Sequence, residues 1–143
     1  MALPVTVDEV NRYMAAELPF CGSFGITCEA LSEGCSVVRW HHDRRWVRPG
    51  GDLEFVSGPV MMAMADVGIY VAIFTLAGIT PLALTNELKM NFLRPAHGRD
   101  LLCTSRIVKA GRRVAYGTAD VEQDGDPGRI VAQASSSYVM PGE

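Results

Sequence analysis

The sequence lacks the features of several common protein classes. Among its 143 residues, 16 Asp and Glu outnumber 13 Lys and Arg, which gives a net charge of −3. Without a basic field, binding to nucleic acid is not expected. No glycine-rich phosphate loop joins a strand to a helix, and the serines at 135–137 lack the G-x-S-x-G setting of a nucleophile elbow. The sequence therefore points away from P-loop and serine-hydrolase chemistry.

Cysteine is scarce, and no two cysteines form a C-x-x-C pair. The four are Cys21, Cys28, Cys35 and Cys103. The spacing of seven residues among the first three matches no metal-ligand pattern, so we expect no metal site. Because no signal peptide is recognised at the start of the sequence, we expect free thiols in a cytoplasmic protein rather than disulfides.

Charge is also nearly absent from residues 57–78, SGPVMMAMADVGIYVAIFTLAG, where Asp66 is the only charged residue. About 20 apolar residues are enough to span a bilayer. A carboxylate at mid-span costs about 2.5–3.5 kcal/mol, however, and the segment lacks flanking basic and aromatic anchors. We therefore predict no membrane contact but a buried core helix, with Ser57 or Gly58 as its N-cap and Gly78 as its C-cap.

The remaining patterns predict one α+β domain over residues 1–143. A capping box predicts a short helix over 6–18, and β-rich runs on both sides of 32–34 predict a hairpin. Residues 43–56 mix charge, proline and glycine and predict an irregular connection. After Pro81, alternating patterns predict four strands in a meander. We expect an antiparallel sheet that wraps around the long helix and leaves apolar surface for a partner subunit.

Asp66 is the residue that most needs an explanation. A carboxylate among apolar neighbours must be neutralised, paired or hydrogen-bonded. Its helical neighbours Met62, Ala63, Ile69 and Tyr70 offer no cation. Two interpretations remain open from the residues alone. Asp66 is either a desolvated general base or nucleophile, or a core polar residue held by backbone or hydroxyl donors.

The start of the same helix, Ser57-Gly58, offers free N–H groups and the positive end of the helix dipole, which suit a developing oxyanion. These features and the segment LKMNFLRPAHGRDLLCTSRIVKAGRRVAYGTADV resemble the hotdog-fold thioesterases of the PaaI-like type, over roughly residues 20–140. The resemblance implies a hotdog fold, in which an antiparallel sheet surrounds one central helix. It also implies a homodimer or homotetramer.

The same resemblance implies hydrolysis of an acyl-CoA or a related thioester in a site shared by two subunits. Asp66 matches the family's base or nucleophile, and Gly58 matches the backbone amide that polarises the thioester carbonyl. Thr85 matches a hydroxyl residue that helps to hold the water. No metal or redox cofactor is implied.

Substrate-binding roles are expected for Ser57 at the helix start and for Arg112 and Arg113 at a basic hairpin tip, which are candidates for CoA phosphates. Many family members have His-Gly-Gly where this chain has Ser57-Gly58-Pro59, and an upstream Asn corresponds to a place near Gly50-Gly51. This departure motivates an alternative, a non-catalytic acyl-CoA or lipid-binding hotdog protein. A hotdog dehydratase is disfavoured because neither predicted helix carries a histidine.

Overall fold

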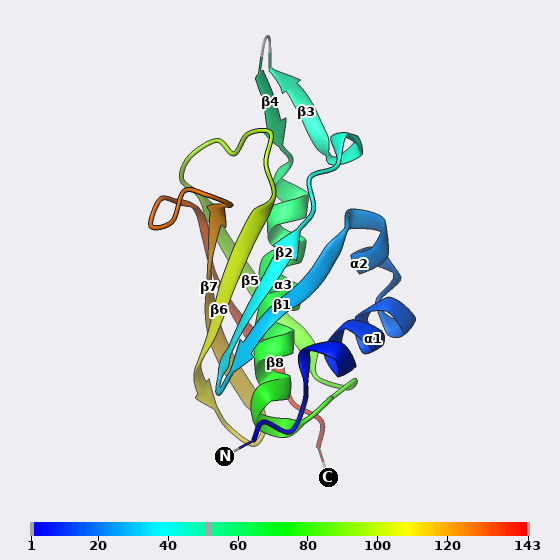
Figure 1. Cartoon of the computed structure of the whole chain (residues 1–143). Coiled ribbons are helices and arrows are strands. Elements are labelled where there is room, and N and C mark those ends of the chain that lie inside the picture. Colours follow the sequence, from blue (N-terminus) through cyan, green and yellow to red (C-terminus); the bar gives the residue numbers. More distant parts are fainter. Residues whose placement is uncertain (1, 51–52, 143) are drawn as a thin grey trace.

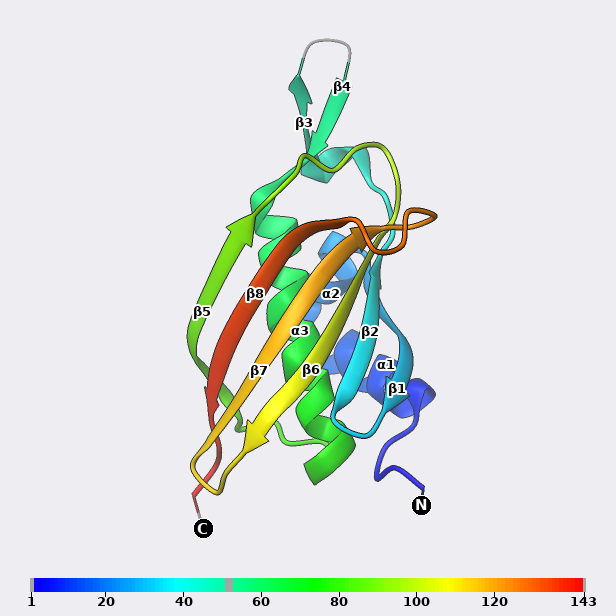
Figure 2. The same cartoon turned by 90° about the vertical axis from the view of Figure 1, so that its left-hand side faces the viewer.

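The computed structural model describes residues 2–50 and 53–142. In this part of the chain the strands form one six-stranded antiparallel sheet, in the order β1-β2-β6-β7-β8-β5, and a separate two-stranded hairpin. The strands of the large sheet are β1 (Ile26–Ser32), β2 (Cys35–Trp40), β5 (Leu84–Phe92), β6 (Leu101–Ala110), β7 (Val114–Gln123) and β8 (Ile130–Val139). The sheet curves around α3 (Gly58–Ala77), as Figures 1 and 2 show. The predicted hotdog fold is confirmed.

The N-terminal segment forms two helices rather than the one that was predicted. In α1 (Val7–Glu17) the capping box is confirmed, because the Thr6 hydroxyl accepts from the Glu9 amide at 3.2 Å and the Glu9 carboxylate accepts from the Thr6 amide at 3.3 Å. A second helix, α2 (Pro19–Phe24), follows at once and ends at Gly25, whose φ of 84° suits glycine. Both helices lie beside β1 and α3 in Figure 1.

The prediction of an irregular connection over 43–56 is wrong. This region contains η1 (Arg44–Trp46), β3 (Val47–Gly50) and β4 (Leu53–Val56). β3 and β4 pair as a hairpin that projects beyond the large sheet in Figure 2. β3 pairs only with β4 among the described strands, so this short edge strand tolerates Pro49. The Arg48 guanidinium lies 5.2 Å from the centre of the Phe55 ring.

The predicted meander of the last four strands is also wrong. Only β6, β7 and β8 follow one another in space, whereas β5 pairs with β8 at the edge of the sheet and β6 lies between β2 and β7. The inward side chains Leu101 and Cys103 of β6 are fully buried, which suits a strand in the interior of the sheet. Most side chains of β5 remain exposed, which suits an edge. Residues 93–100 carry the chain across the end of the sheet (Figure 1).

The long helix is the centre of the core. α3 is apolar and long enough to cross a membrane, but 72% of its most apolar window is buried inside the fold. Ser57 and Gly78 cap it, as predicted. At Gly68 the helix approaches β6 so closely that a Cβ atom would lie 2.3 Å from the Ser105 hydroxyl. The Ser36 hydroxyl donates to the Gly68 carbonyl at 2.6 Å, which fixes the helix against the sheet.

The cysteines are free thiols, as predicted. Three of them, Cys21, Cys28 and Cys103, are buried, and Cys35 is half-buried. Burial raises the pKa of the Cys103 thiol to about 12 and, with smaller effects from neighbouring groups, that of the Cys28 thiol to about 11. These two thiols are therefore neutral packing groups at physiological pH.

Candidate active site

Asp66 lies near the middle of α3, on the side that faces the start of β5. Its half-buried side chain lines a cleft of about 380 Å³, here called the Asp66 cleft. The walls come from α1, α2, α3, the loop before β5 and the end of β8. The one charge of the apolar helix is thus accessible from solvent.

Two hydroxyl groups hold one oxygen of the Asp66 carboxylate. The Thr85 hydroxyl donates to Oδ1 at 2.7 Å, and the Tyr138 phenol donates to the same atom. Within residues 2–50 and 53–142, Oδ2 has no hydrogen-bond partner and no Lys, Arg or His forms an ion pair with Asp66. Asp66 is therefore held on one side and open on the other, which a purely structural carboxylate would not require.

A β-bulge turns Thr85 toward Asp66. Strict alternation along β5 would place Thr85 on the outer face together with Glu87. Instead the register shifts between these two residues, so that Asn86 is inserted without a partner and Thr85 pairs with Tyr138. Because successive side chains alternate, one extra residue reverses the direction of those before it. The bulge therefore places Thr85 and Tyr138 together over Asp66.

The phenol of Tyr138 is almost fully buried, with 2% of the residue exposed. Burial, together with the neighbouring Asp66 charge, raises the pKa of Tyr138 far above its usual range, so the group stays a neutral donor. The ring stacks on Tyr70 with 5.8 Å between centroids, and the Tyr70 and Tyr13 hydroxyls are 2.9 Å apart. Burial and the Asp66 charge also raise the pKa of the Cys21 thiol to about 12, which disfavours it as a nucleophile.

Gly58 lies in a second cleft, of about 350 Å³, here called the Gly58 cleft. Arg48, Phe92 and Arg94 contribute to its walls. The Gly58 N–H, at the first position of α3, has no acceptor among the residues described. It is therefore available to a ligand oxygen at the positive end of the helix.

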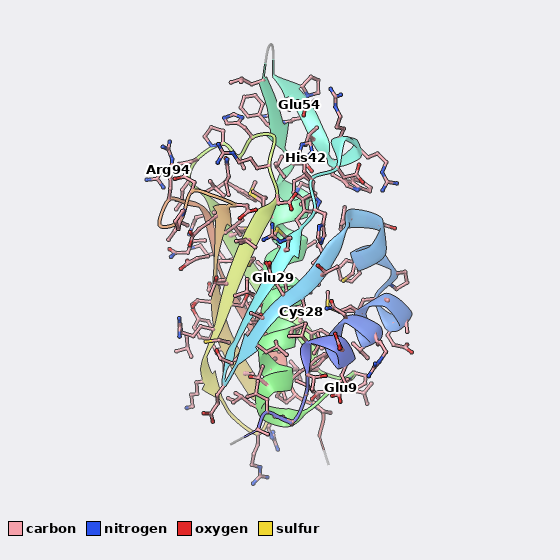
Figure 3. All side chains as sticks on the ribbon, in the orientation of Figure 1. Glu9, Cys28, Glu29, His42, Glu54 and Arg94 are labelled. Carbon is pink, nitrogen blue, oxygen red and sulfur yellow. The ribbon has the colours of Figure 1, made fainter. Side chains whose placement is uncertain are left out.

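Other groups at this end serve the structure. The Ser57 hydroxyl, predicted to bind substrate, donates to the Trp46 carbonyl at 2.7 Å and so is engaged within the fold. The Arg94 guanidinium donates to the Ile130 carbonyl at the start of β8. Figure 3 shows Arg94 beside the loop that follows β5. Gly50 packs under the Phe55 ring, and Gly51 lies outside the described residues.

Within one chain the two clefts do not form a single site. Gly58 and Asp66 are eight residues apart on α3, which corresponds to about 12 Å along the helix axis. The Asp66 cleft adjoins the first residues of β5, and the Gly58 cleft adjoins the last. The structure thus brings together Asp66 and Thr85, and holds Gly58 apart from both.

Arg112 and Arg113 form the exposed turn between β6 and β7. Neither makes an ion pair with any residue that the structure describes. Val139 pairs with Leu84 on one side and with Val114 on the other, so this turn lies at the Asp66 end of the sheet, about 10 Å from the start of β5. The predicted phosphate-binding pair is therefore near the Asp66 cleft, not in it.

The histidines lie elsewhere. His42 is next to Glu54 at the base of the β3–β4 hairpin, with 3.7 Å between Nε2 and the carboxylate (Figure 3). His41 bonds to the Thr27 hydroxyl, and His97 to the Glu54 carbonyl. Across the described ranges, no three His, Cys, Asp or Glu side chains are grouped as metal ligands.

Sequence reasoning missed Tyr138. The final strand pattern SSSYVM predicts its inward direction, but the contact with Asp66 depends on how β8 pairs with β5, which no local pattern states. A weaker signal was present on α3, where Tyr70 lies one helical turn after Asp66.

Known proteins are similar to this chain in sequence and in fold. Residues 53–129 match the family model of the thioesterase superfamily. A protein of Saccharolobus solfataricus, named provisionally as an esterase, is 29% identical over 136 residues, which cover 95% of this chain and 86% of that protein.

Solved structures give the same result. The crystal structure of a protein from a Silicibacter species, provisionally described as a thioesterase, has a TM-score of 0.86 and 32% identity, and covers 99% of this chain and 96% of that one. The phenylacetic acid degradation protein PaaI from Thermus thermophilus, in a mutant form, has a TM-score of 0.72 and 22% identity. This match covers 86% of this chain and 99% of the PaaI chain, and it shows a shared fold.

Proposed function

Because the chain belongs to the thioesterase superfamily, for which thioester hydrolysis is the general reaction, we propose that it hydrolyses an acyl-CoA, with Asp66 as general base or nucleophile. One observation carries the proposal. Two hydroxyls hold Oδ1 of Asp66, Oδ2 has no partner among the described residues, and no Lys, Arg or His is among the residues that line the cleft. A carboxylate held in this way can accept a proton from water or attack a carbonyl carbon.

A complete site requires a second copy of the chain. β5 is an edge strand with unpaired backbone groups on its free side. The surface along it is apolar: Leu84 is 63% exposed, Phe92 50% and Leu93 52%, and Met62 of α3 is also exposed. Such a surface is suited to burial against an identical surface.

A twofold axis through the middle of β5 would make two copies of this strand antiparallel. The first residues of one β5 then face the last residues of the other, because antiparallel strands run in opposite directions. The Asp66 cleft of each chain would thereby meet the Gly58 cleft of its partner. We infer a homodimer with two such composite sites, which is compatible with a larger assembly of dimers.

The reaction then follows from the groups in the composite site. The thioester carbonyl oxygen accepts a hydrogen bond from the Gly58 N–H at the helix start. Asp66 Oδ2 takes a proton from a water molecule whose oxygen attacks the carbonyl carbon. The C–S bond of the tetrahedral intermediate breaks, and the thiolate takes the proton from Asp66. The products are a carboxylic acid and a free thiol.

The test is thiol release from a panel of short, long and aromatic acyl-CoAs, with wild type beside Asp66→Asn. The Asn side chain keeps an acceptor oxygen for Thr85 and Tyr138, so we expect an intact fold and a kcat about 1,000-fold lower. Asp126→Asn in the β7–β8 turn is the matched control. Its side chain makes no hydrogen bond with the described residues, so it should retain wild-type kcat.

The alternative function is non-catalytic acyl-CoA or lipid binding. The observation that favours it is the hydrogen bond from the Ser57 hydroxyl to the Trp46 carbonyl, because it makes this hydroxyl unavailable to orient substrate at the helix start. Acyl-CoA binding without turnover, equal in wild type and Asp66→Asn, would establish it and would reduce Asp66 to a structural residue.

A further inference from the structure

Tyr138 is the second hydroxyl donor to Asp66, and the sequence analysis did not identify it. Its phenol reaches Asp66 from β8, which pairs with β5 on the side away from the free edge of the sheet. Unlike Thr85, which is exposed on the edge strand, Tyr138 is buried and cannot exchange its bond for one to bulk water.

The phenol lies against two oxygens of the same residue. It donates to Oδ1 of Asp66 and is 2.6 Å from the Asp66 main-chain carbonyl. A phenol has one hydrogen, so it can serve only one of them at a time, and the charged carboxylate is the stronger acceptor. Because the phenol lies between these two oxygens, it holds Oδ1 of Asp66 at a fixed position relative to the Asp66 main chain.

The ring that carries this phenol is itself fixed. It stacks on Tyr70 with an angle of 12° between the ring planes, and Tyr70 packs in turn on Phe74 at 4.6 Å. Cross-strand pairing with Thr85 on β5 and with Ala115 on β7 holds its backbone on both sides. A donor on so rigid a support restricts its acceptor.

We propose that Tyr138 is a positioning residue, which together with Thr85 holds Oδ1 of Asp66 so that Oδ2 is directed at the reacting carbon or water. This inference rests on the proposed function and identifies a further residue of the same site. Two donors on one oxygen exclude the rotamers in which Oδ2 turns toward the sheet. The remaining rotamer keeps the reactive oxygen in the cleft before substrate arrives.

The kinetic test is Tyr138→Phe, with Tyr116→Phe as the matched control. Tyr116 is 41% exposed on β7 and does not line the Asp66 cleft. We expect kcat of Tyr138→Phe to fall about tenfold with KM within about twofold, because the hydrogen bond acts on the carboxylate and not on substrate binding. Tyr116→Phe should keep both constants. An unchanged kcat in Tyr138→Phe would overturn the proposal, and so would a loss confined to KM.

A second readout does not depend on activity. Crystal structures of wild type and Tyr138→Phe should show one Asp66 rotamer in the first and a rotated or doubled carboxylate in the second. An Asp66 side chain that keeps its place in Tyr138→Phe would refute positioning, whatever the kinetics. If wild type hydrolyses no acyl-CoA, the proposed function fails, while the two structures still decide whether Tyr138 fixes Asp66.

Discussion

The two ends of β5 border clefts with opposite chemistry. The Asp66 cleft holds a carboxylate with two hydroxyl donors and is walled by tyrosines. The Gly58 cleft holds a backbone amide at a helix N-terminus that has no acceptor among the described residues, and Phe92 and two arginines contribute to its walls. One end can supply a base or nucleophile, and the other can stabilise negative charge on a carbonyl oxygen. Neither end can do both.

The cause of this division is the helix itself. Only one end of a helix has free N–H groups, and a carboxylate about two turns further along cannot reach the same ligand atom. A small domain with one central helix therefore cannot place both groups on one carbonyl. The proposed dimer would bring the two groups together without new residues, because antiparallel association pairs each end with the opposite end of a second copy.

The strongest test of this division combines two inactive chains. Gly58→Pro removes the amide hydrogen. Proline is compatible with position 58, because Ser57 before it is extended and residue 58 is the first of the helix. We expect kcat to fall about 100-fold or more, as for the loss of one oxyanion donor. In a dimer of Gly58→Pro with Asp66→Asn, one composite site keeps both groups and the other has neither. Its activity should be about half that of wild type.

Two differently tagged chains, co-expressed and purified through both tags, provide that mixed dimer. Gly58→Ala is the steric control. It adds a Cβ that would lie 3.3 Å from the Phe92 ring but keeps the N–H, so it measures how much of the fall in kcat comes from added bulk alone. A mixed dimer no more active than its two parents would mean that Gly58 and Asp66 do not act across subunits.

A second test removes the Thr85 hydroxyl and so alters only the Asp66 end. Thr85→Val keeps the bulge and the β-branched shape of the side chain, but leaves Tyr138 as the single donor to Asp66. We expect kcat to fall at least about tenfold, from the lost hydrogen bond to a charged group. Circular dichroism should show that the sheet is retained.

Asn86→Ala is the control, because it keeps the bulge and removes only the exposed bond from the Asn86 amide to the Ser137 hydroxyl. It should retain wild-type kcat. Full activity in Thr85→Val would show that the Thr85 hydroxyl is not needed.

Much of the fold was predictable because it depends on local patterns. The capping box fixed the start of α1, and the switch from an apolar run to alternation after Pro81 separated α3 from β5. Strand order was not predictable, since alternation reports which side of a strand is buried and not which strand lies next to it. The hairpin of β3 and β4 was missed because it lies outside the main sheet and its strands lack an alternating apolar pattern. Pro49 and the neighbouring charged residues are instead typical of an irregular loop.

The candidate site was predictable only in its helical part. Asp66 and Gly58 stand out because a charge in an apolar helix and a capped helix start are local signals. Thr85 was identified by resemblance, and from the residues alone alternation would have placed it on the wrong face, since a one-residue bulge has no clear signature in LTNELKMNF. Tyr138 comes from a strand more than fifty residues later and needs the tertiary pairing.

The smallest expected effect concerns the rim of the Asp66 cleft. Arg112 and Arg113 lie in an exposed turn at that end of the sheet, and CoA carries phosphates that guanidinium groups bind well. We expect Arg112→Ala/Arg113→Ala to raise KM for an acyl-CoA about threefold to tenfold with kcat unchanged, and the effect to shrink as salt screens the charges. Arg106→Ala, on the outer face of β6 and three strands away from β5, removes an exposed arginine without this placement and should leave KM unchanged. An acyl thioester of N-acetylcysteamine has no phosphates, so its KM should not respond to either change. An equal rise in KM for both thioesters would mean that the arginines support the shape of the cleft rather than bind the nucleotide.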